Sequence, residues 1–94
     1  MFVALCHFSV DSSAFPQSKD QAHFIQRIRD KVFARFKLLL SEVGSGDEIV
    51  LAAALVNRDE HYLRSFFGKI LEFIEESEGV RIVSEQLEII QRSA

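Results

Sequence analysis

Nine consecutive residues, Glu48–Val56, constrain the fold of this chain more than any other stretch, because every one of them after Glu48 is apolar. The run is short for a buried helix, and its length suits a β-strand that is covered on both faces. The other elements of the chain need an apolar surface to pack on. We therefore predict that Glu48–Val56 is a central strand and that the rest of the fold is arranged around it.

The size and composition of the chain set its class. Ninety-four residues, 48% of them hydrophobic, suit one globular domain with a single core, and we expect residues 1–94 to form it. No stretch reaches the roughly 18 consecutive apolar residues of a membrane span, and the start of the chain lacks the basic region of a signal peptide. Cys6 is the only cysteine, which excludes an internal disulfide and indicates a cytoplasmic protein.

The charge of the chain is unevenly distributed. The net charge of −3 argues against extensive coating of nucleic acid. Residues 19–37, however, contain six Lys or Arg and two Asp, whereas residues 38–94 contain five Lys or Arg and eleven Asp or Glu. The basic character is therefore concentrated in one early segment.

The hydrophobic periodicity divides the chain into four strands and two helices. We expect strands at 2–10, 37–43, 48–56 and 80–90, with a bulge near 84–86 in the last one, and helices at about 18–36 and 59–77. The Gly-Ser-Gly-Asp stretch at 44–47 is the predicted tight turn between the second and third strands. Two strands joined this closely must be antiparallel neighbours.

Capping residues mark the predicted helices. Ser18 and Gln21 have the spacing of a capping box, Asp59 is a predicted N-cap, and Gly79 is a predicted left-handed C-cap. Gly68 costs the second helix about 1 kcal/mol relative to Ala, so we expect close packing there. The predicted buried stripes are Ala22, Ile25, Ile28, Val32 and Phe36, widened by Phe33, in the first helix and Leu63, Phe67, Ile70 and Ile74 in the second.

The C-terminal end of the second predicted helix is crowded with acidic residues, namely Glu72, Glu75, Glu76 and Glu78. Negative charges at a helix C-terminus oppose the helix dipole. We therefore expect this end to fray or to find a cationic partner.

The predicted order of elements is β-α-β-β-α-β, the ferredoxin-like arrangement. Because the crossovers are right-handed, both helices lie on one face of a four-stranded antiparallel sheet. The first and third strands then occupy the middle of the sheet, and these are the two most apolar strands. The sequence thus predicts an α+β fold in which pattern and topology agree.

Several stretches carry a resemblance to a known family. Leu51–Asp59 resembles an apolar strand that ends in Ser-Asn-Asp, and Ile70–Glu75 and Val80–Ile90 resemble the second helix and last strand of the same family. Gln17–Asp20 stands where that family has Ser-Leu-Lys-Asp/Glu, and Phe36–Gly44 also fits. These are features of the YlxP-like family of small uncharacterised bacterial proteins, and they cover nearly the whole chain.

The chain departs from that family at two places. Gln21 and Ala22 replace a Lys-Arg pair, and a Trp-Gln-Arg segment before the third strand is missing, so that the connection 44–48 is shorter. The resemblance implies the ferredoxin-like fold and an association with translation and ribosome maturation. It implies no catalytic activity.

The sequence contains no constellation that indicates catalysis, a metal site or a cofactor. The histidines His7, His23 and His61 are scattered, and Cys6 has no second thiol nearby. Gly44–Gly46 leads into a strand rather than a helix and so lacks the dipole of a phosphate-binding loop. We expect a protein that is not an enzyme and holds no metal.

The first helix carries the strongest binding signal. Arg27, Lys31 and Arg35 are four residues apart and form one predicted exposed row, with Phe24 beside it and Lys19 near its start. Basic side chains bind phosphates, and an exposed ring can stack on a base. The row predicts contact with RNA or the ribosome. The alternative is a solvated helix face with internal ion pairs such as Arg27 with Asp30.

The open face of the sheet is the second candidate surface. If both helices cover one face, alternate apolar residues remain on the other, and Val3, Leu5, Leu51 and Leu55 are the candidates for it. Such a face is larger than a monomer usually leaves in water. A homodimer is the simplest cover, and the alternatives are a bound metabolite or a face that stays exposed.

Overall fold

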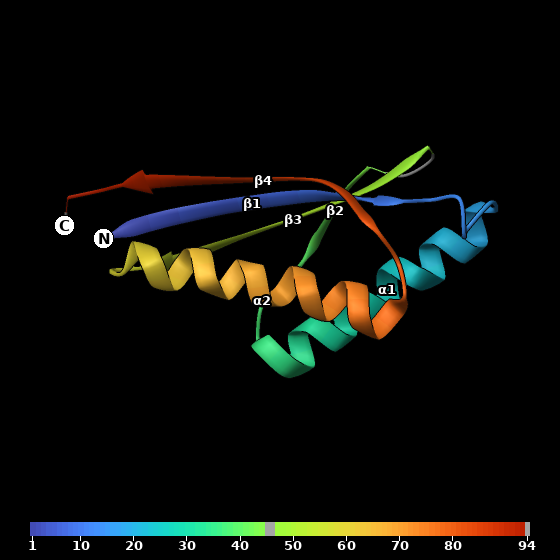
Figure 1. Ribbon diagram of the computed structural model, residues 1–94, viewed down its shortest axis with the longest axis horizontal. Coiled ribbons are helices and arrows are strands. Elements are labelled where there is room, and N and C mark those ends of the chain that lie inside the picture. The colour runs from blue at the N-terminus through green and yellow to red at the C-terminus, as the bar shows by residue number, and fades with distance from the viewer. Residues whose placement is uncertain (45–46, 94) are drawn as a thin grey trace.

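The computed structural model describes residues 1–44 and 47–93 and confirms the predicted ferredoxin-like order (Figure 1). The elements are β1 (Phe2–Asp11), α1 (Ser18–Phe36), β2 (Ser41–Gly44), β3 (Glu48–Asn57), α2 (Glu60–Glu78) and β4 (Ile82–Gln91). The strands form one antiparallel sheet in the order β2-β3-β1-β4, so the two most apolar strands are central, as predicted.

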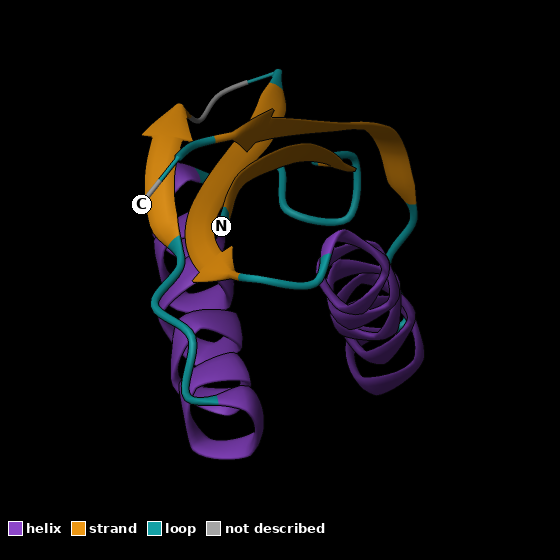
Figure 2. Ribbon diagram, turned by 90° about the vertical axis from the view of Figure 1, so that its left-hand side faces the viewer, coloured by secondary structure: helices purple, strands orange, loops and turns teal. Residues whose placement is uncertain are grey.

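Both helices pack on the same face of the sheet, as Figure 2 shows. The core lies between them and the helix-facing residues of the two central strands, which are Ala4, Cys6, Phe8 and Val10 on β1 and Ile49, Leu51 and Ala53 on β3. The predicted stripe of α2 is buried, and Leu71 adds to it. Because both helices lie on one face, no helix among the described residues covers the opposite face of the sheet, to which every second side chain of a strand points.

The start of α1 differs from the prediction. The N-cap is Gln17 and makes no side-chain capping bond, so Ser18 is already helical and the capping box is not formed. Instead, Gln21 donates from Nε2 to the backbone oxygen of Phe15 at 3.1 Å. The buried stripe is also rotated, because Ala22 is exposed and Phe24 is buried.

Strand β2 is shorter than predicted because the chain must first cross from the helix layer to the sheet. Lys37 takes the left-handed conformation, with φ 57°, and ends α1. Leu38 and Leu40 are buried in the connection rather than in a strand. The predicted turn at 44–47 falls partly on residues 45 and 46, which lie outside the described residues.

The second helix has both predicted caps. Asp59 accepts a hydrogen bond from the backbone N–H of Tyr62 at 3.2 Å, and Gly79 is left-handed with φ 63°. The prediction of close packing at Gly68 is wrong, because no neighbouring atom of the described residues lies within 4 Å of where a Cβ would stand.

The last strand contains a bulge one residue before the predicted segment. Ser9 pairs with Ser84 and Val10 pairs with Ile82, so Val83 is the extra residue. The N–H of Ile82 donates to Glu75 Oε2 at 3.1 Å. A bulge of this kind bends an edge strand and increases its twist.

Candidate functional site

Two of the three cations in the predicted row of α1 are engaged with α2. Arg27 Nε lies 2.7 Å from Glu78 Oε1, and Lys31 Nζ donates to Glu78 Oε2. The side chain of Glu78 is only 4% exposed, whereas those of Arg27 and Lys31 are nearly half exposed. The acidic C-terminal end of α2 therefore has the cationic partners that were one of the two outcomes predicted from the sequence. The ion pair considered within the helix is replaced, since Asp30 accepts from Gln26 instead.

The two cations also control the ionisation of Glu78. Burial raises the pKa of this carboxyl, but the hydrogen bonds from Lys31 and Arg27 and their positive charges outweigh burial and hold the pKa below its usual value. Glu78 is therefore ionised at neutral pH. The charge that the row offers to a phosphate is reduced accordingly.

The placement of Phe24 on the exposed surface was wrong. Its ring is fully buried and stacks on Phe15 with ring centroids 4.7 Å apart. Phe24, Ile28 and Val32 are spaced by four residues and share the core-facing side of the helix. This ring cannot stack on a base in the folded protein. The sequence signal for its burial is this i, i+4, i+8 series, which competes with the periodic stripe that begins at Ala22.

Arg35 and the C-cap residue Lys37 lie near aromatic rings at the C-terminal end of α1. Arg35 lies over Phe73, with its guanidinium carbon 5.0 Å from the ring centroid. Phe33, which the sequence placed at the edge of the buried stripe, is 46% exposed, and Lys37 Nζ lies 5.6 Å from its ring centroid. Lys19 is exposed on the first turn. The exposed aromatic ring of this helix is thus Phe33.

The open face of the sheet holds only half of the residues predicted for it. Val3 and Leu5 lie there, but Leu51 and Leu55 were assigned wrongly: Leu51 is fully buried beneath the helices, and Leu55 packs against the same core. Both pair with helix-facing residues of β1, because Phe8 opposes Leu51 and Ala4 opposes Leu55.

The alternate residues of β3 and β4 complete the open face. Val3 pairs with Val56 on one side and Ile90 on the other, and Leu5 pairs with Ala54. We call these five residues, Val3, Leu5, Ala54, Val56 and Ile90, the open-face patch. Leu5, Val56 and Ile90 are each between 39% and 53% exposed. The rest of the face is mixed: His7, Ser9 and their partners on β4 are polar, whereas Ala52 and Val50 on β3 are apolar. Ser84 donates to Ser9 at 3.0 Å.

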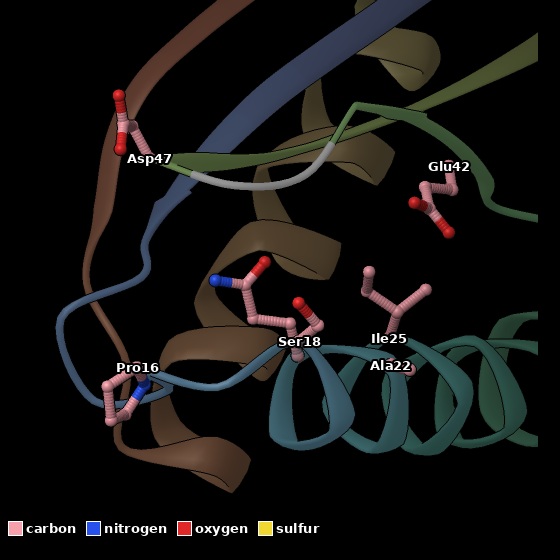
Figure 3. Close-up of a pocket in the computed structure, with 7 residues that line it drawn as sticks. Pro16, Ser18, Ala22, Ile25, Glu42 and Asp47 are labelled. Atoms are coloured by element: carbon pink, nitrogen blue, oxygen red, sulfur yellow. The ribbon is translucent and has the colours of Figure 1, made fainter.

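A cavity of about 350 Å³ opens between the start of α1 and the hairpin of β2 and β3 (Figure 3). Its lining residues are Pro16, Ser18, Gln21, Ala22, Ile25, Glu42 and Asp47. The N–H groups of a helix N-terminus attract anions. Glu42 and Asp47 oppose that attraction, because two carboxylates border the same space. The cavity is therefore poorly suited to a phosphate group.

Three further features are the thiol of Cys6, the arrangement of possible metal ligands and the apolar character of the helices. Cys6 is buried, and burial, together with the negative charge of Glu85, raises its pKa to about 11, so the thiol is neutral at physiological pH. Within residues 1–44 and 47–93, no three His, Cys, Asp or Glu side chains gather as metal ligands do. Neither helix of this part of the chain is long and apolar enough to cross a membrane.

Comparison with known proteins shows the fold and the family. The designed protein Foldit4 is 11% identical over 98% of each chain, with a TM-score of 0.55. The designed ferredoxin-fold protein LFR1 1 is 14% identical, with a TM-score of 0.58, over 100% of this chain and 87% of that one. At these identities the likeness shows the fold alone. No match was found among curated proteins. Residues 3–87 match the family described as proteins of unknown function, DUF503, and the chain belongs to that family.

Proposed function

We propose that this protein is a non-enzymatic binding module of the bacterial cytoplasm that pairs with a second copy of itself through the open-face patch. The observation that supports this is the register of the sheet. Val3, Val56 and Ile90 are directly paired across three strands, and Leu5 and Ala54 continue the same apolar surface. Contiguous exposed apolar surface of this kind marks interaction sites.

The charge of the face favours a second copy of the same chain. The alternate residues Val3, Leu5, His7 and Ser9 lie on the open face with their partners on β3 and β4. Among these described residues, Glu88 is the single formally charged side chain. A two-fold pairing brings the same patch of each copy together. Apolar residues then meet apolar residues, and little like charge is brought into contact.

The size of the face predicts a weak dimer. The three long strands have ten residues each. At about 3.3 Å per residue and about 4.8 Å between strands, they present roughly 500 Å². Stable interfaces bury about 800 Å² on each partner. We therefore expect a dissociation constant in the micromolar range or weaker.

The test compares two leucine substitutions by light scattering at a protein concentration of about 200 µM, well above a micromolar dissociation constant. Leu5→Lys places a charge in the open-face patch and should give monomer of 10.7 kDa. Leu39→Lys makes the same change at a residue that is 70% exposed and lies outside the patch, so it should retain the wild-type mass. Equal masses for wild type and Leu5→Lys would contradict the proposal, and so would a loss of mass in both variants.

Binding to RNA or the ribosome through α1 is the second candidate, and one observation supports it. The exposed ring of Phe33 has Lys37 at 5.6 Å and Arg29 one helical turn before it. An aromatic face beside cations suits an unpaired base and its phosphate. The resemblance to YlxP-like proteins points in the same direction.

Co-sedimentation with ribosomes tests this second candidate. Two phosphate contacts, from Arg29 and Lys37, give a log–log salt dependence with a slope of about −1.4 on single-stranded RNA. Phe33→Ala should weaken any such binding while leaving the fold intact. Binding that is insensitive to salt or to Phe33→Ala would exclude this surface.

A further inference from the structure

A second cavity, of about 150 Å³, lies between α2 and the edge strand β4, on the covered side of the sheet and away from the open-face patch. Its apolar lining comes from Cys6, Phe67, Leu71 and Leu87. A wider hollow of about 540 Å³ adjoins it, because Gly68, Leu71 and Glu85 line both. A cavity of about 150 Å³ holds a ligand of roughly the size of benzene.

Gly68 keeps this space open. It stands in the middle of α2, and a Cβ built there would have no neighbouring atom within 4 Å. Glycine destabilises the interior of a helix more than nearly every other residue does. No close approach among the described residues accounts for it. Gly68 is itself exposed at the edge of the cavity, where a side chain would extend over the opening, so the glycine leaves the opening unobstructed.

Glu85 gives the cavity its charge. It pairs with Phe8 across the sheet and therefore lies on the helix side of β4. Its negative charge contributes to the raised pKa of the Cys6 thiol, which places the two groups near each other. In the described part of the chain, Glu85 forms no hydrogen bond or ion pair. Arg64, which lines the cavity with it, is paired with Glu60 at 3.0 Å, and Lys69 lines the adjoining hollow without an ion pair to Glu85.

Glu85 is exposed, and a charge on an edge strand also discourages edge-to-edge pairing of sheets. That role needs no free space beside Gly68. The combination of an apolar floor, a glycine-made opening and an unpaired carboxylate indicates a ligand with a short apolar stem and a positive charge.

We propose that the cavity between α2 and β4 binds an alkylammonium group, with its carbon chain against Phe67, Leu71 and Leu87 and its charge at Glu85. The group comes either from a small free amine or from a lysine side chain of a partner protein. Both sources present the same chemistry to the cavity.

The test is an NMR titration of the whole protein at pH 7 with n-butylammonium, using 1-butanol as the uncharged probe of equal shape. The backbone amides of Gly68, Leu71 and Leu87 should shift and saturate with a dissociation constant of about 1–10 mM, as expected for so small a ligand. Butanol should bind at least about tenfold more weakly, because it leaves the carboxylate without a charged partner. No saturation by about 50 mM n-butylammonium, or equal binding of butanol, overturns the proposal.

Two variants and one control locate the site. Gly68→Leu should fill the cavity and abolish the titration, and Glu85→Gln should weaken binding about tenfold, while the NMR spectra report that both remain folded. Glu88→Gln removes the same charge from the opposite face of β4 and should leave binding unchanged. Wild-type binding by either cavity variant overturns the assignment. Tighter binding of 1,4-diaminobutane than of Nα-acetyl-lysinamide assigns the site to free amines, and the reverse order assigns it to a lysine side chain.

Discussion

The guanidinium of Arg27 donates to the carboxylate of Glu78 at 2.7 Å and joins two residues that are 51 positions apart in the chain. Lys31 shares the same carboxylate. The contact fixes the last turn of α2 against α1, where an acidic helix end would otherwise oppose its own dipole. Residues whose spacing suggests a nucleic-acid site therefore take part in holding the two helices together.

Glu78→Gln should lower the free energy of unfolding by about 1 kcal/mol, because the lost pair is largely desolvated on one side but exposed on the other. Urea unfolding followed by circular dichroism measures the change. Glu76→Gln is the matched control, since it removes an exposed acid from the same helix end and should leave stability unchanged or slightly higher. Equal losses in both variants would contradict a specific role for Glu78.

The same carboxylate predicts an acid dependence of stability. The pKa of Glu78 in the folded protein lies below its ordinary value of 4.5. Its contribution is therefore fully present above pH 4.5 and is lost as the pH falls from there through the lowered pKa. The difference in unfolding free energy between wild type and Glu78→Gln should shrink across this range. A difference that stays constant down to pH 2 would show that proton linkage at Glu78 is absent.

Reversal of both cations tests what the row on α1 does. Arg27→Glu with Lys31→Glu places three carboxylates together at the end of α2. We expect a loss of unfolding free energy larger than that of Glu78→Gln, since like charges then replace an ion pair. Adding Glu78→Lys to the double variant should restore part of the lost free energy of unfolding. A double variant as stable as the wild type would show that the row is a free surface.

Two of the three phenylalanines of α1, Phe24 and Phe33, should respond to substitution by different amounts. Phe24→Ala removes a fully buried ring and should cost about 3–5 kcal/mol of stability. Phe33→Ala removes a half-exposed ring and should cost less than about 1 kcal/mol. Thermal unfolding of both variants measures the contrast. Similar losses in the two would place Phe33 in the core.

Gly68→Ala should raise the free energy of unfolding by about 0.5–1 kcal/mol, because alanine favours the helix and no neighbouring atom obstructs the added methyl group. Urea unfolding gives the value. A loss of stability would mean that the space beside α2 closes in solution.

The topology was predictable from the sequence because the two helices and the first strand have clear hydrophobic periods and the third strand is a continuous apolar run. The orientation of α1 about its own axis was not predictable from the sequence. Ala22 and Phe24 both border its apolar stripe, and only packing against the sheet decides which of them is buried. Leu51 and Leu55 show the same limit. A strand that is apolar at every position from Ile49 to Val56, as β3 is, does not indicate which alternate set faces the helices. The register with β1 decides it, because Phe8 and Ala4 fix Leu51 and Leu55 on the covered side.

The sequence predicted the contact of Glu78 with Arg27 only in part. The acidic end of α2 indicated a need for a cation, but the identity of that cation depends on how the two helices lie against each other. Gly68 was misleading as a sequence feature, because a glycine inside a helix usually indicates close packing. In this structure the glycine lies beside an open cavity.

The pairing of two copies through the open-face patch is tested most directly by sedimentation equilibrium of the unmodified protein from about 5 µM to about 500 µM, a range that brackets a micromolar dissociation constant. The account predicts an average mass that rises from 10.7 kDa toward twice that value as concentration increases. A mass that stays at 10.7 kDa throughout would contradict it.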